Sequence, residues 1–428
     1  MAPGWVEHAV WWHVYPLGFS GGGGLGRLES WLDYAIELGC SGLALGPIFA
    51  SQTHGYDTVD YFRIDPRLGD EEDFDHLVVA AKQRGLRLLL DGVFNHVGRS
   101  FPRFQQALSD GPDSESGRWF RWQAGRPAVF EGHEQLVALN HEEPAVAGLV
   151  GDVMEHWLER GADGWRLDAA YAVPDRFWRP VIDRVRARYD QAWWVAEVIH
   201  GDYAGRVVAS GYDSVTQYEL WKATWSAIND ANWFELAWAI QRHDQWVKQF
   251  APMTFIGNHD VTRIASRIED PRHLAHALVV LLTLPGVPSV YYGDEQAFRG
   301  IKEERAGGDD AVRPAFPAGP AELPPEGWPT YRLHQELIGL RRRHPWLHRA
   351  SVQIEETTNQ TLVYRCAAGS ESLRVGLNLA DAPMRVAAQD GTQEAVVLAR
   401  PGRAGAGGAD GTDNTVIEID GHGWAIWR

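Results

Sequence analysis

Cysteine, long apolar runs and positive charge are scarce in this sequence of 428 residues. It has only two cysteines, Cys40 and Cys366, which excludes a scaffold built on disulfides and predicts free thiols. No apolar run approaches the roughly 20 residues of a membrane-spanning helix, which excludes an integral membrane protein. The 40 basic and 57 acidic side chains give a net charge of −17, which argues against nucleic acid as a partner.

The first residues, Met1-Ala-Pro-Gly-Trp-Val-Glu-His8, also lack the basic start and long apolar stretch of a secretory signal. Together with the free thiols, this predicts a cytoplasmic protein. Tryptophan, in contrast, is abundant, with 20 residues. Flat indole faces suit stacking on sugar rings, but most of these tryptophans are expected in the core or at an interface.

Short apolar runs alternate with helix-like stretches up to residue 345. The strand candidates are Val10–Tyr15, Gly42–Leu45, Leu86–Phe94, Gly164–Asp168, Trp193–Glu197, Ser214–Tyr218, Met253–Gly257 and Pro288–Tyr292. The helix candidates include Leu28–Leu38, Glu72–Arg84, Ala145–Arg160, Asp175–Tyr189, Arg272–Leu284 and Tyr331–Arg343. Eight strands separated by helices predict a (β/α)8 TIM barrel, with an open doubly wound sheet as the alternative.

Two stretches depart from this alternation. Residues 97–140 are rich in glycine, proline and polar residues and exceed an ordinary loop in length, which predicts a small inserted subdomain. After residue 345, alternating apolar residues predict a C-terminal antiparallel β-sandwich, with Ala399–Asp413 as a loose loop. The strand candidates there are Leu362–Tyr364, Leu373–Leu379, Ala395–Leu398 and Val416–Ile419. The predicted domains are therefore a barrel of residues 1–96 and 141–345, a subdomain of residues 97–140 and a β-sandwich domain of residues 346–428.

Ionisable residues end four of the candidate barrel strands, where the catalytic residues of such barrels lie. The third strand ends with Asp91 and His96, the fourth with Arg166 and Asp168, the fifth with Glu197 and His200, and the seventh with Asn258, His259 and Asp260. Any one of these aspartates alone could be only a helix N-cap. Together they predict an active site, because it is costly to bury like charges close to one another.

This combination suits glycosyl transfer, in which one carboxylate attacks the anomeric carbon and a second, protonated one donates to the leaving oxygen. Asp168, kept ionised by Arg166, is the candidate nucleophile. Glu197 follows the apolar run Trp193-Trp-Val-Ala196, where desolvation favours the protonated form and suits an acid/base. His96 and His259 are expected to donate hydrogen bonds to sugar hydroxyls, and Asp260 to accept them.

Four segments resemble the signature regions of the α-amylase family of retaining glycosidases, glycoside hydrolase family 13. They are Asp91–His96, Gly164–Asp168, the strand end at Glu197 and Phe255–Asp260, in the order and spacing of the family. Gly286-Val-Pro-Ser-Val-Tyr-Tyr-Gly-Asp-Glu295 resembles the eighth-strand motif of the family, so the resemblance covers nearly the whole chain. It implies that Asp168 is the nucleophile, Glu197 the acid/base and Asp260 the stabiliser of the transition state.

The resemblance also implies a set of substrate-binding residues. Tyr56 would be the stacking platform for the sugar that is cleaved, and Arg166, His96 and His259 would line its subsite. His54 stands where relatives that remove single glucose units have aspartate, so the non-reducing side is expected to stay open. Asp91, His200 and Arg313 complete the expected substrate-binding set.

Within the family, Tyr56-Asp-Thr-Val-Asp-Tyr61, Ile64–Asp70 and Leu136–Asn140 are similar to the neopullulanase, cyclomaltodextrinase and maltogenic-amylase group. That group usually has an extra N-terminal β domain, whereas the barrel here begins almost at residue 5. It also has Asn-Glu where this chain has Tyr171-Ala172, and Trp where this chain has Ile199. Acceptor and product preference are therefore left open.

No cofactor or metal is predicted. The first loop, Ser20-Gly-Gly-Gly-Gly-Leu-Gly26, lacks the carboxylates with which some relatives bind calcium. The usual calcium site would retain Asn95, but Tyr171-Ala172 replaces the Lys-His pair of calcium-dependent α-amylases. Calcium is thus possible but not expected, and no HExxH or Cys/His cluster indicates zinc.

The leading hypothesis is a retaining hydrolase that cuts α-glucosidic bonds, α-1,4 by preference, in short or cyclic malto-oligosaccharides by double displacement. One alternative is a transglucosidase or isomerase that uses the same covalent intermediate. A second is a non-catalytic glycan-binding protein on the same fold, against which the intact Asp168, Glu197 and Asp260 argue. The expected partner is an oligosaccharide, while the linkage, endo or exo action and oligomeric state are left open.

Overall fold

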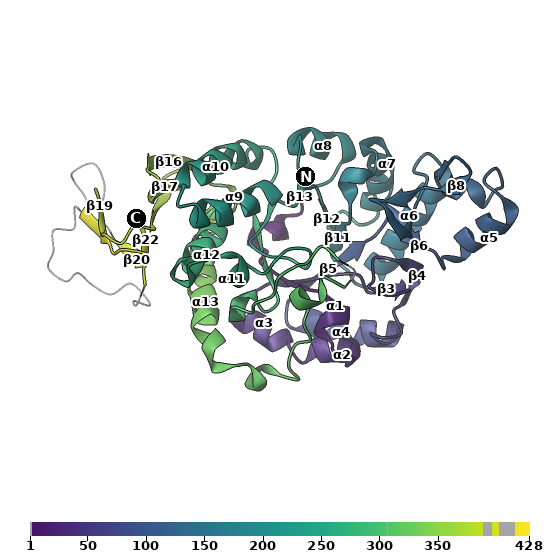
Figure 1. Ribbon diagram of the computed structural model, residues 1–428, viewed down its shortest axis with the longest axis horizontal. Helices are drawn as coiled ribbons and strands as arrows, with labels where there is room; N and C mark the ends of the chain where they lie inside the picture. Colours follow the sequence, from purple (N-terminus) through teal and green to yellow (C-terminus); the bar gives the residue numbers. More distant parts are fainter. Residues whose placement is uncertain (1, 306, 388–395, 402–415) are drawn as a thin grey trace.

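Eight parallel strands form the centre of the molecule (Figure 1). The structure, a computed structural model, describes residues 2–305, 307–387, 396–401 and 416–428. The barrel strands are β1 (Trp11–Val14), β2 (Gly42–Leu45), β5 (Arg87–Gly92), β11 (Gly164–Leu167), β12 (Trp193–Ala196), β13 (Ser214–Val215), β14 (Met253–Phe255) and β15 (Val287–Tyr291). They pair in the order β13-β12-β11-β5-β2-β1-β15-β14, and a bridge between Thr216 and Met253 joins the two ends. The predicted TIM barrel is therefore confirmed, as a nearly closed ring rather than an open sheet.

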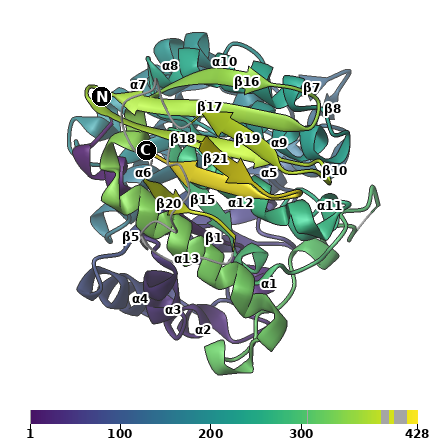
Figure 2. The ribbon, with the colours of Figure 1, turned by 90° about the vertical axis from the view of Figure 1, so that its left-hand side faces the viewer.

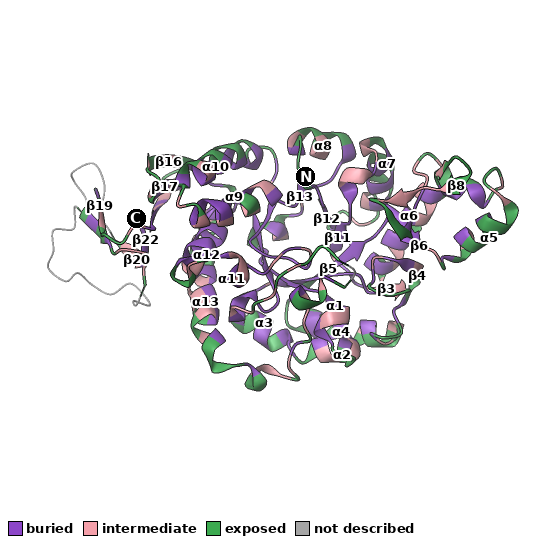
Figure 3. Ribbon diagram, in the orientation of Figure 1, coloured by how far each residue is buried: buried purple, intermediate pink, exposed green. Residues whose placement is uncertain are grey.

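The barrel strands are buried on both faces, as is typical of parallel strands covered by helices (Figure 3). Trp11 and Trp193 stack inside the N-terminal end of the barrel, with ring centroids 5.8 Å apart. The short 3-10 helix Gly4–His8 adds Val6 to this packing. Ten tryptophans are less than 2% exposed, so the excess of tryptophan mainly serves the core, as expected.

Helices follow the strands along the chain. They are α1 (Pro16–Phe19), α2 (Gly24–Glu29), α3 (Leu32–Leu38), α4 (Glu71–Gln83), α6 (Pro144–Glu159), α7 (Asp175–Arg186), α8 (Tyr203–Ser210), α9 (Tyr218–Asn229), α10 (Trp233–Val247), α11 (Ile264–Arg267), α12 (Leu274–Thr283) and α13 (Trp328–Arg343). The prediction of one helix over Leu28–Leu38 is wrong, because the chain turns between α2 and α3. Trp31 at this turn is fully buried against Phe19 and Phe316, so packing of its ring fixes the break.

Two excursions leave the barrel on the side where its strands end. The first, after β2, is the hairpin of β3 (Phe49–Ser51) and β4 (Thr58–Ile64). The second, after β5, contains the antiparallel sheet β6-β10-β9, α5 (Pro102–Asp110) and a small hairpin, and it projects to the right in Figure 1. Its strands are β6 (His96–Gly98), β7 (Trp122–Gln123), β8 (Arg126–Pro127), β9 (Val129–Phe130) and β10 (His133–Ala138).

The chain beyond α13 forms antiparallel sheets, as predicted (Figure 2). One sheet has the order β16-β17-β18-β22-β20 and the other pairs β19 with β21. The strands are β16 (Ser351–Thr357), β17 (Thr361–Ala368), β18 (Glu371–Asn378), β19 (Met384–Ala387), β20 (Val397–Ala399), β21 (Val416–Ile419) and β22 (Trp424–Trp427). The sheets pack through Val363, Val386, Ile417 and Trp427.

Two predictions for this part of the chain fall partly outside the described residues. Ala395, the first residue of one predicted strand, lies outside them, and so do residues 402–413 of the predicted loop Ala399–Asp413. Ala399 itself ends β20. Among the helices that the structure describes, none is long and apolar enough to cross a membrane.

Candidate active site

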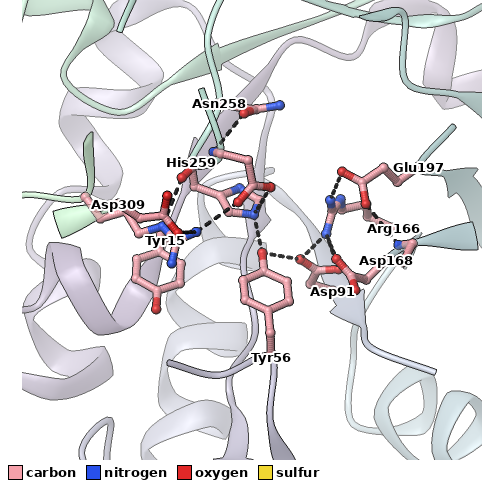
Figure 4. A network of polar contacts seen from close by, with 12 residues as sticks. Tyr15, Tyr56, Asp91, Arg166, Asp168, Glu197, Asn258, His259 and Asp309 are labelled. Carbon is pink, nitrogen blue, oxygen red and sulfur yellow. Dashed lines mark hydrogen bonds and ion pairs between the residues drawn. The ribbon is translucent and has the colours of Figure 1, made fainter. Parts of the chain in front are cut away.

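The ladders of the barrel bring charged side chains to one rim (Figure 4). Asp91 on β5 and Arg166 on β11 are register partners. Leu167 and Ala196 are partners in the next ladder, so Asp168 and Glu197, which directly follow them, emerge side by side. His259 and Asp260 follow β14 on the far side of the ring. The structure thus brings together the strand-end residues that the sequence analysis singled out, apart from His200.

Arg166 lies at the centre of an ion-pair cluster. Its Nη1 donates to both oxygens of Asp91, at 2.8 and 2.6 Å, and to Oδ1 of Asp168 at 3.0 Å. Its Nη2 lies 2.6 Å from Oε1 of Glu197. All four side chains are buried, so these charges interact at a low effective dielectric. One guanidinium therefore holds the candidate nucleophile and the candidate acid next to each other.

Arg166 forms ion pairs with three carboxyl groups. Burial raises the pKa of Asp168 well above its usual range, against the attraction of Arg166 and with added repulsion from Glu197. Burial also raises the pKa of Asp91. Arg166 lowers the pKa of Asp168, as a nearby cation should, but burial and the neighbouring carboxyl groups raise it by more. The cluster holds a proton more tightly than isolated carboxyl groups do.

Glu197 is fixed through both of its oxygens. Oε2 accepts a hydrogen bond from the backbone N–H of Ala169 at 2.9 Å, and Oε1 accepts one from the hydroxyl of Tyr218 at 3.1 Å. Asn258 Nδ2 donates to that hydroxyl at 2.9 Å. Ala169 has a φ of +44°, which is uncommon for a residue with a Cβ atom. This left-handed turn directly after Asp168 aims the Ala169 N–H at Glu197.

Asp260 has cationic partners of its own. Its Oδ2 lies 2.9 Å from His259 Nε2, and its Oδ1 accepts a hydrogen bond from Arg313 Nη2 at 2.8 Å. Burial by itself would raise the pKa of Asp260, but His259 and Arg313 outweigh burial and hold it well below the usual range. Asp260 and Asp168 thus face the same space with opposite shifts in proton affinity.

Tyr56 connects the two groups of charges. Its hydroxyl donates to Asp91 Oδ2 at 3.1 Å and contacts His259 Nε2. Its ring stacks on the His259 ring, with centroids 5.3 Å apart and planes 10° apart. The half-buried ring therefore lies at the rim, where a stacking platform was expected.

The remaining predicted histidines have different surroundings. His54 Nδ1 accepts a hydrogen bond from the Tyr56 backbone at 3.2 Å, and its side chain is 44% exposed. His96 stacks on Phe130 at 4.8 Å, and burial lowers its pKa to about 3, so the ring is neutral. His96 Nε2 is buried without a hydrogen-bond partner among the described residues. His200 is exposed and makes no contact with this network.

The inserted excursion contacts the chain that follows Asp168. Phe130 covers His96, and the next residue, Glu131, accepts a hydrogen bond from the Tyr171 hydroxyl at 2.8 Å. Tyr171 is one of the three residues, with Ala172 and Ile199, at which this chain departs from the pattern of the group that it resembles. Its backbone N–H also bonds to the Glu197 carbonyl at 3.3 Å, so this contact spans the excursion and the acid-bearing strand.

Sequence reasoning missed three residues of the network. His13 on β1 lies 3.2 Å from His259 Nδ1, Tyr15 stacks on the His259 ring, and Tyr218 bonds to Glu197. Only His13 left a signal, as one ionisable residue within the apolar run Trp11-Trp-His-Val-Tyr15. The tyrosines belong to no pattern that distinguishes them from core residues.

Asn95, the residue that this chain would retain of the usual calcium site, is fully buried between β5 and β6. Its side-chain oxygen is buried without a partner among the described residues. Calcium needs six to eight oxygen ligands, commonly several carboxylates. The side-chain nitrogen of Asn95 lies 3.1 Å from His96 Nδ1, and its backbone carbonyl accepts a hydrogen bond from the Leu139 N–H. That the enzyme needs no calcium stays a prediction.

Comparison with known proteins relates this geometry to a family. Residues 13–350 match the catalytic domain of alpha amylase. A cyclomaltodextrinase of Geobacillus thermopakistaniensis is 30% identical over 435 residues, covering 91% of this chain and 72% of that protein. The debranching enzyme of Nostoc punctiforme superposes with a TM-score of 0.84 at 25% identity, over 100% of this chain and 99% of that one.

A further structure, the cyclic alpha-maltosyl-(1→6)-maltose hydrolase of Arthrobacter globiformis, superposes with a TM-score of 0.84 at 23% identity. It covers 100% of this chain and 99% of that one, and has also been solved with maltose. At this identity the likeness shows the fold alone. The match to the catalytic domain spans barrel, inserted excursion and the rim around Arg166, and it makes the chain a member of the alpha-amylase family of glycoside hydrolases.

Proposed function

We propose that this chain hydrolyses α-1,4-glucosidic bonds in short or cyclic malto-oligosaccharides, by double displacement with retention of the anomeric configuration. The observation that supports this most is the pair of carboxyl groups, Asp168 and Glu197, on the two terminal nitrogens of Arg166. Retaining glycosidases need two such groups close together, one to attack and one to protonate. The relatedness to a cyclomaltodextrinase supports the choice of substrate class.

In the first step, Asp168 attacks the anomeric carbon while Glu197 gives its proton to the leaving oxygen, and the glycosidic bond breaks. In the second, Glu197 takes a proton from water, whose oxygen attacks the same carbon and releases Asp168. Each of the two displacements inverts the anomeric carbon, so together they retain its configuration. Asp260, kept ionised by His259 and Arg313, accepts hydrogen bonds from the sugar ring as positive charge develops.

The substrate is held by aromatic and imidazole groups of the rim. Tyr56 stacks on the sugar at the cleavage point, and the buried Nε2 of His96 gains a hydroxyl partner there. Asp91 and Arg313 fix Tyr56 and Asp260 in position and border the same subsite. His200, which is exposed after the Glu197 strand, is proposed to contact the leaving side.

Product analysis tests the proposal. The enzyme is incubated with maltotriose, maltoheptaose, β-cyclodextrin, pullulan, isomaltose, trehalose and sucrose, and the first-formed anomer is followed by NMR. We expect α-anomers from the malto-oligosaccharides and the cyclodextrin. Chains longer than the substrate would show the transglucosidase instead. Binding of maltoheptaose without any product would show the non-catalytic glycan-binding protein, and β-anomers would overturn the double displacement.

The location of the enzyme is a further part of the proposal. Cys40 and Cys366 are both buried free thiols, and burial raises their pKa values above the ordinary range, which keeps them unreactive. A chain without a disulfide between its described residues suits a reducing compartment, so we place its activity in the cytoplasm. Cell fractionation with antibody detection checks this.

A further inference from the structure

A cluster of metal-binding residue types lies away from the active-site rim. Asp270 precedes the 3-10 helix Pro271–His273, which leads into α12, and His422 lies in the turn between β21 and β22. One ligand atom from each of Asp270, His273 and His422 lies within 4.8 Å of the others. Of the residues that the structure describes, these form the one group of three or more with that property.

The imidazole nitrogens are oriented for a cation. His422 Nε2 donates to Asp381 Oδ1 at 2.8 Å, so His422 Nδ1 carries the lone pair. That Nδ1 lies 2.9 Å from His273 Nε2. A carboxylate that accepts a hydrogen bond from the far nitrogen of a histidine is the usual outer partner of a metal ligand, because it fixes the tautomer and makes the ligating nitrogen more basic.

The backbone holds His422 in this orientation. Its φ is +57°, a region that residues with a Cβ atom rarely adopt, and its N–H donates to the Ala380 carbonyl at 3.0 Å. A side chain at the preceding Gly421 would meet the Asp381 carbonyl oxygen at 2.1 Å, so that position needs glycine. The turn thus places a strained, partly buried histidine next to His273.

The local charge also favours a cation. Two carboxylates, Asp270 and Asp381, lie at this cluster, and Arg272 pairs with Asp270 at 2.6 Å. Among the described residues of the cluster, two carboxylates thus stand against one arginine, which leaves a net negative charge.

We propose that Asp270, His273 and His422 form a binding site for one Zn²⁺ ion, with Asp381 orienting His422. Two imidazole nitrogens and a carboxylate oxygen are zinc ligands, and water completes a tetrahedral shell. The nitrogen ligands argue against calcium and magnesium, which take oxygen. With Zn–N bonds of about 2.0–2.1 Å, the two rings need to separate by only a few tenths of an ångström. The ion would connect the start of α12 to the C-terminal sheets, beside the hydrogen bond from His276 to Gly423.

The test is a titration of the full chain, stripped with a chelator, with ZnCl2 by calorimetry and by equilibrium dialysis. We expect one ion per chain and a rise in Tm of roughly 2–5 °C at about 100 times Kd. CoCl2 should give the visible absorption bands of a tetrahedral site. His422→Asn and His273→Gln should each weaken binding at least about tenfold, and Asp381→Asn by about 10–100-fold.

Asparagine is chosen at residue 422 because it tolerates the left-handed backbone, so this variant should keep its fold, as circular dichroism can verify. His76→Gln, on the exposed face of α4, is the matched control and should bind zinc as the unaltered chain does. Absence of stoichiometric zinc, or equal affinity in folded His422→Asn and His76→Gln, overturns the proposal and leaves an ordinary hydrogen bond between two neutral histidines.

Discussion

Asp168 and Asp260 differ in how they hold a proton. Burial among three carboxyl groups raises the pKa of Asp168, whereas His259 and Arg313 lower the pKa of Asp260. The carboxyl groups around Arg166 therefore bind a proton more readily than ordinary aspartates do, whereas Asp260 stays ionised to lower pH.

This difference predicts an acidic limb in the pH profile of kcat/KM. Asp168 attacks only as a carboxylate, and its pKa is raised, so activity is present above that pKa and lost as the pH falls through it. With a neutral substrate, the inflection should lie above the value of roughly 3.9 of an ordinary aspartate. Circular dichroism at each pH separates titration from unfolding, and an inflection at or below about pH 4 would contradict the shift.

Replacement of Asp168 by asparagine should abolish turnover. The amide cannot attack the anomeric carbon, and losses on removal of a nucleophile reach at least about a thousandfold in kcat. The fold should survive, because the side chain keeps its size and can still bond to Arg166. Asp230→Asn, at an exposed position after α9, is the matched control. Near-normal activity of Asp168→Asn would rule out its role as the nucleophile.

We expect His54 to set how far a chain can extend on the non-reducing side. A half-exposed imidazole leaves an edge along which further sugars can lie, whereas a carboxylate would bind the hydroxyls of a terminal sugar. We therefore expect a higher kcat/KM for maltotriose than for maltose, and a lower ratio of the two in His54→Asp. If His54 only packs its loop, the ratio will be the same in both proteins.

The central site residues could be predicted because each lies at the end of a barrel strand or directly after it. The rule that strand ends carry the chemistry therefore singled out Asp91, Arg166, Asp168 and Glu197. Tyr15 joins the same network by stacking its ring on His259, and Tyr218 joins it through a hydrogen bond to Glu197. Both depend on a three-dimensional contact, which a linear pattern of residues does not record.

Among the elements, the barrel strands were predicted within a few residues, because a short apolar run between polar stretches is distinct. β22, with the sequence Trp-Ala-Ile-Trp, was missed since all four residues are buried and no alternation marks it. β16 was missed for the opposite reason, because most of its side chains are at least partly exposed. The division of the chain at residues 96, 140 and 345 remains a prediction, which limited proteolysis can check.

The 3-10 helix Asp294–Gln296 after β15 buries a carboxyl group without a cation of its own. Glu295 accepts hydrogen bonds from the Tyr34 hydroxyl at 3.0 Å and the Gly293 N–H at 2.8 Å, and burial raises its pKa to about 7. The folded chain therefore binds this proton more tightly than the unfolded chain does. Its contribution to stability is complete below the unfolded pKa of about 4.3 and is lost as the pH rises through 7.

Glu295→Gln should remove the loss of stability above pH 7, because glutamine carries no charge at any pH. The free energy of unfolding should rise by up to roughly 3 kcal/mol at pH 8 and change little at pH 5. Urea unfolding at the two pH values measures it, with Glu37→Gln on the exposed side of α3 as the control. An equal change at both pH values would show that Glu295 holds no such proton.

In the molecule as a whole, the residues of the proposed zinc site could not be predicted from the sequence. His273 and His422 are 149 residues apart and belong to a barrel helix segment and a turn of the C-terminal sheets. No spacing rule joins them, because their contact depends on how the two parts pack. Zinc motifs such as HExxH consist of ligands that lie a few residues apart in the sequence, so they do not include a pair such as His273 and His422.

Removal of metal by a chelator should therefore lower the Tm of the protein without changing its kinetic constants. We expect EDTA to leave kcat and KM unchanged within experimental error, because the proposed double displacement proceeds through carboxyl groups and needs no metal. Assays of chelated enzyme with and without added CaCl2 measure this. Loss of turnover that calcium restores would show a metal requirement that the residues around Asn95 do not explain.

Few backbone hydrogen bonds join β13 to β14, where the ring of strands closes. The Thr216–Met253 bridge, the hydrogen bond from the Gln217 N–H to the Met253 carbonyl and the one from the Ser214 hydroxyl to the Ala251 carbonyl connect the two sides. A joint with so few backbone hydrogen bonds opens readily, so we expect its amide hydrogens to exchange with deuterium sooner than those of β5 and β11. Glu197 and Asp260 follow the strands on either side of this joint, so its opening would change the distance between the proposed proton donor and the proposed stabilising carboxylate.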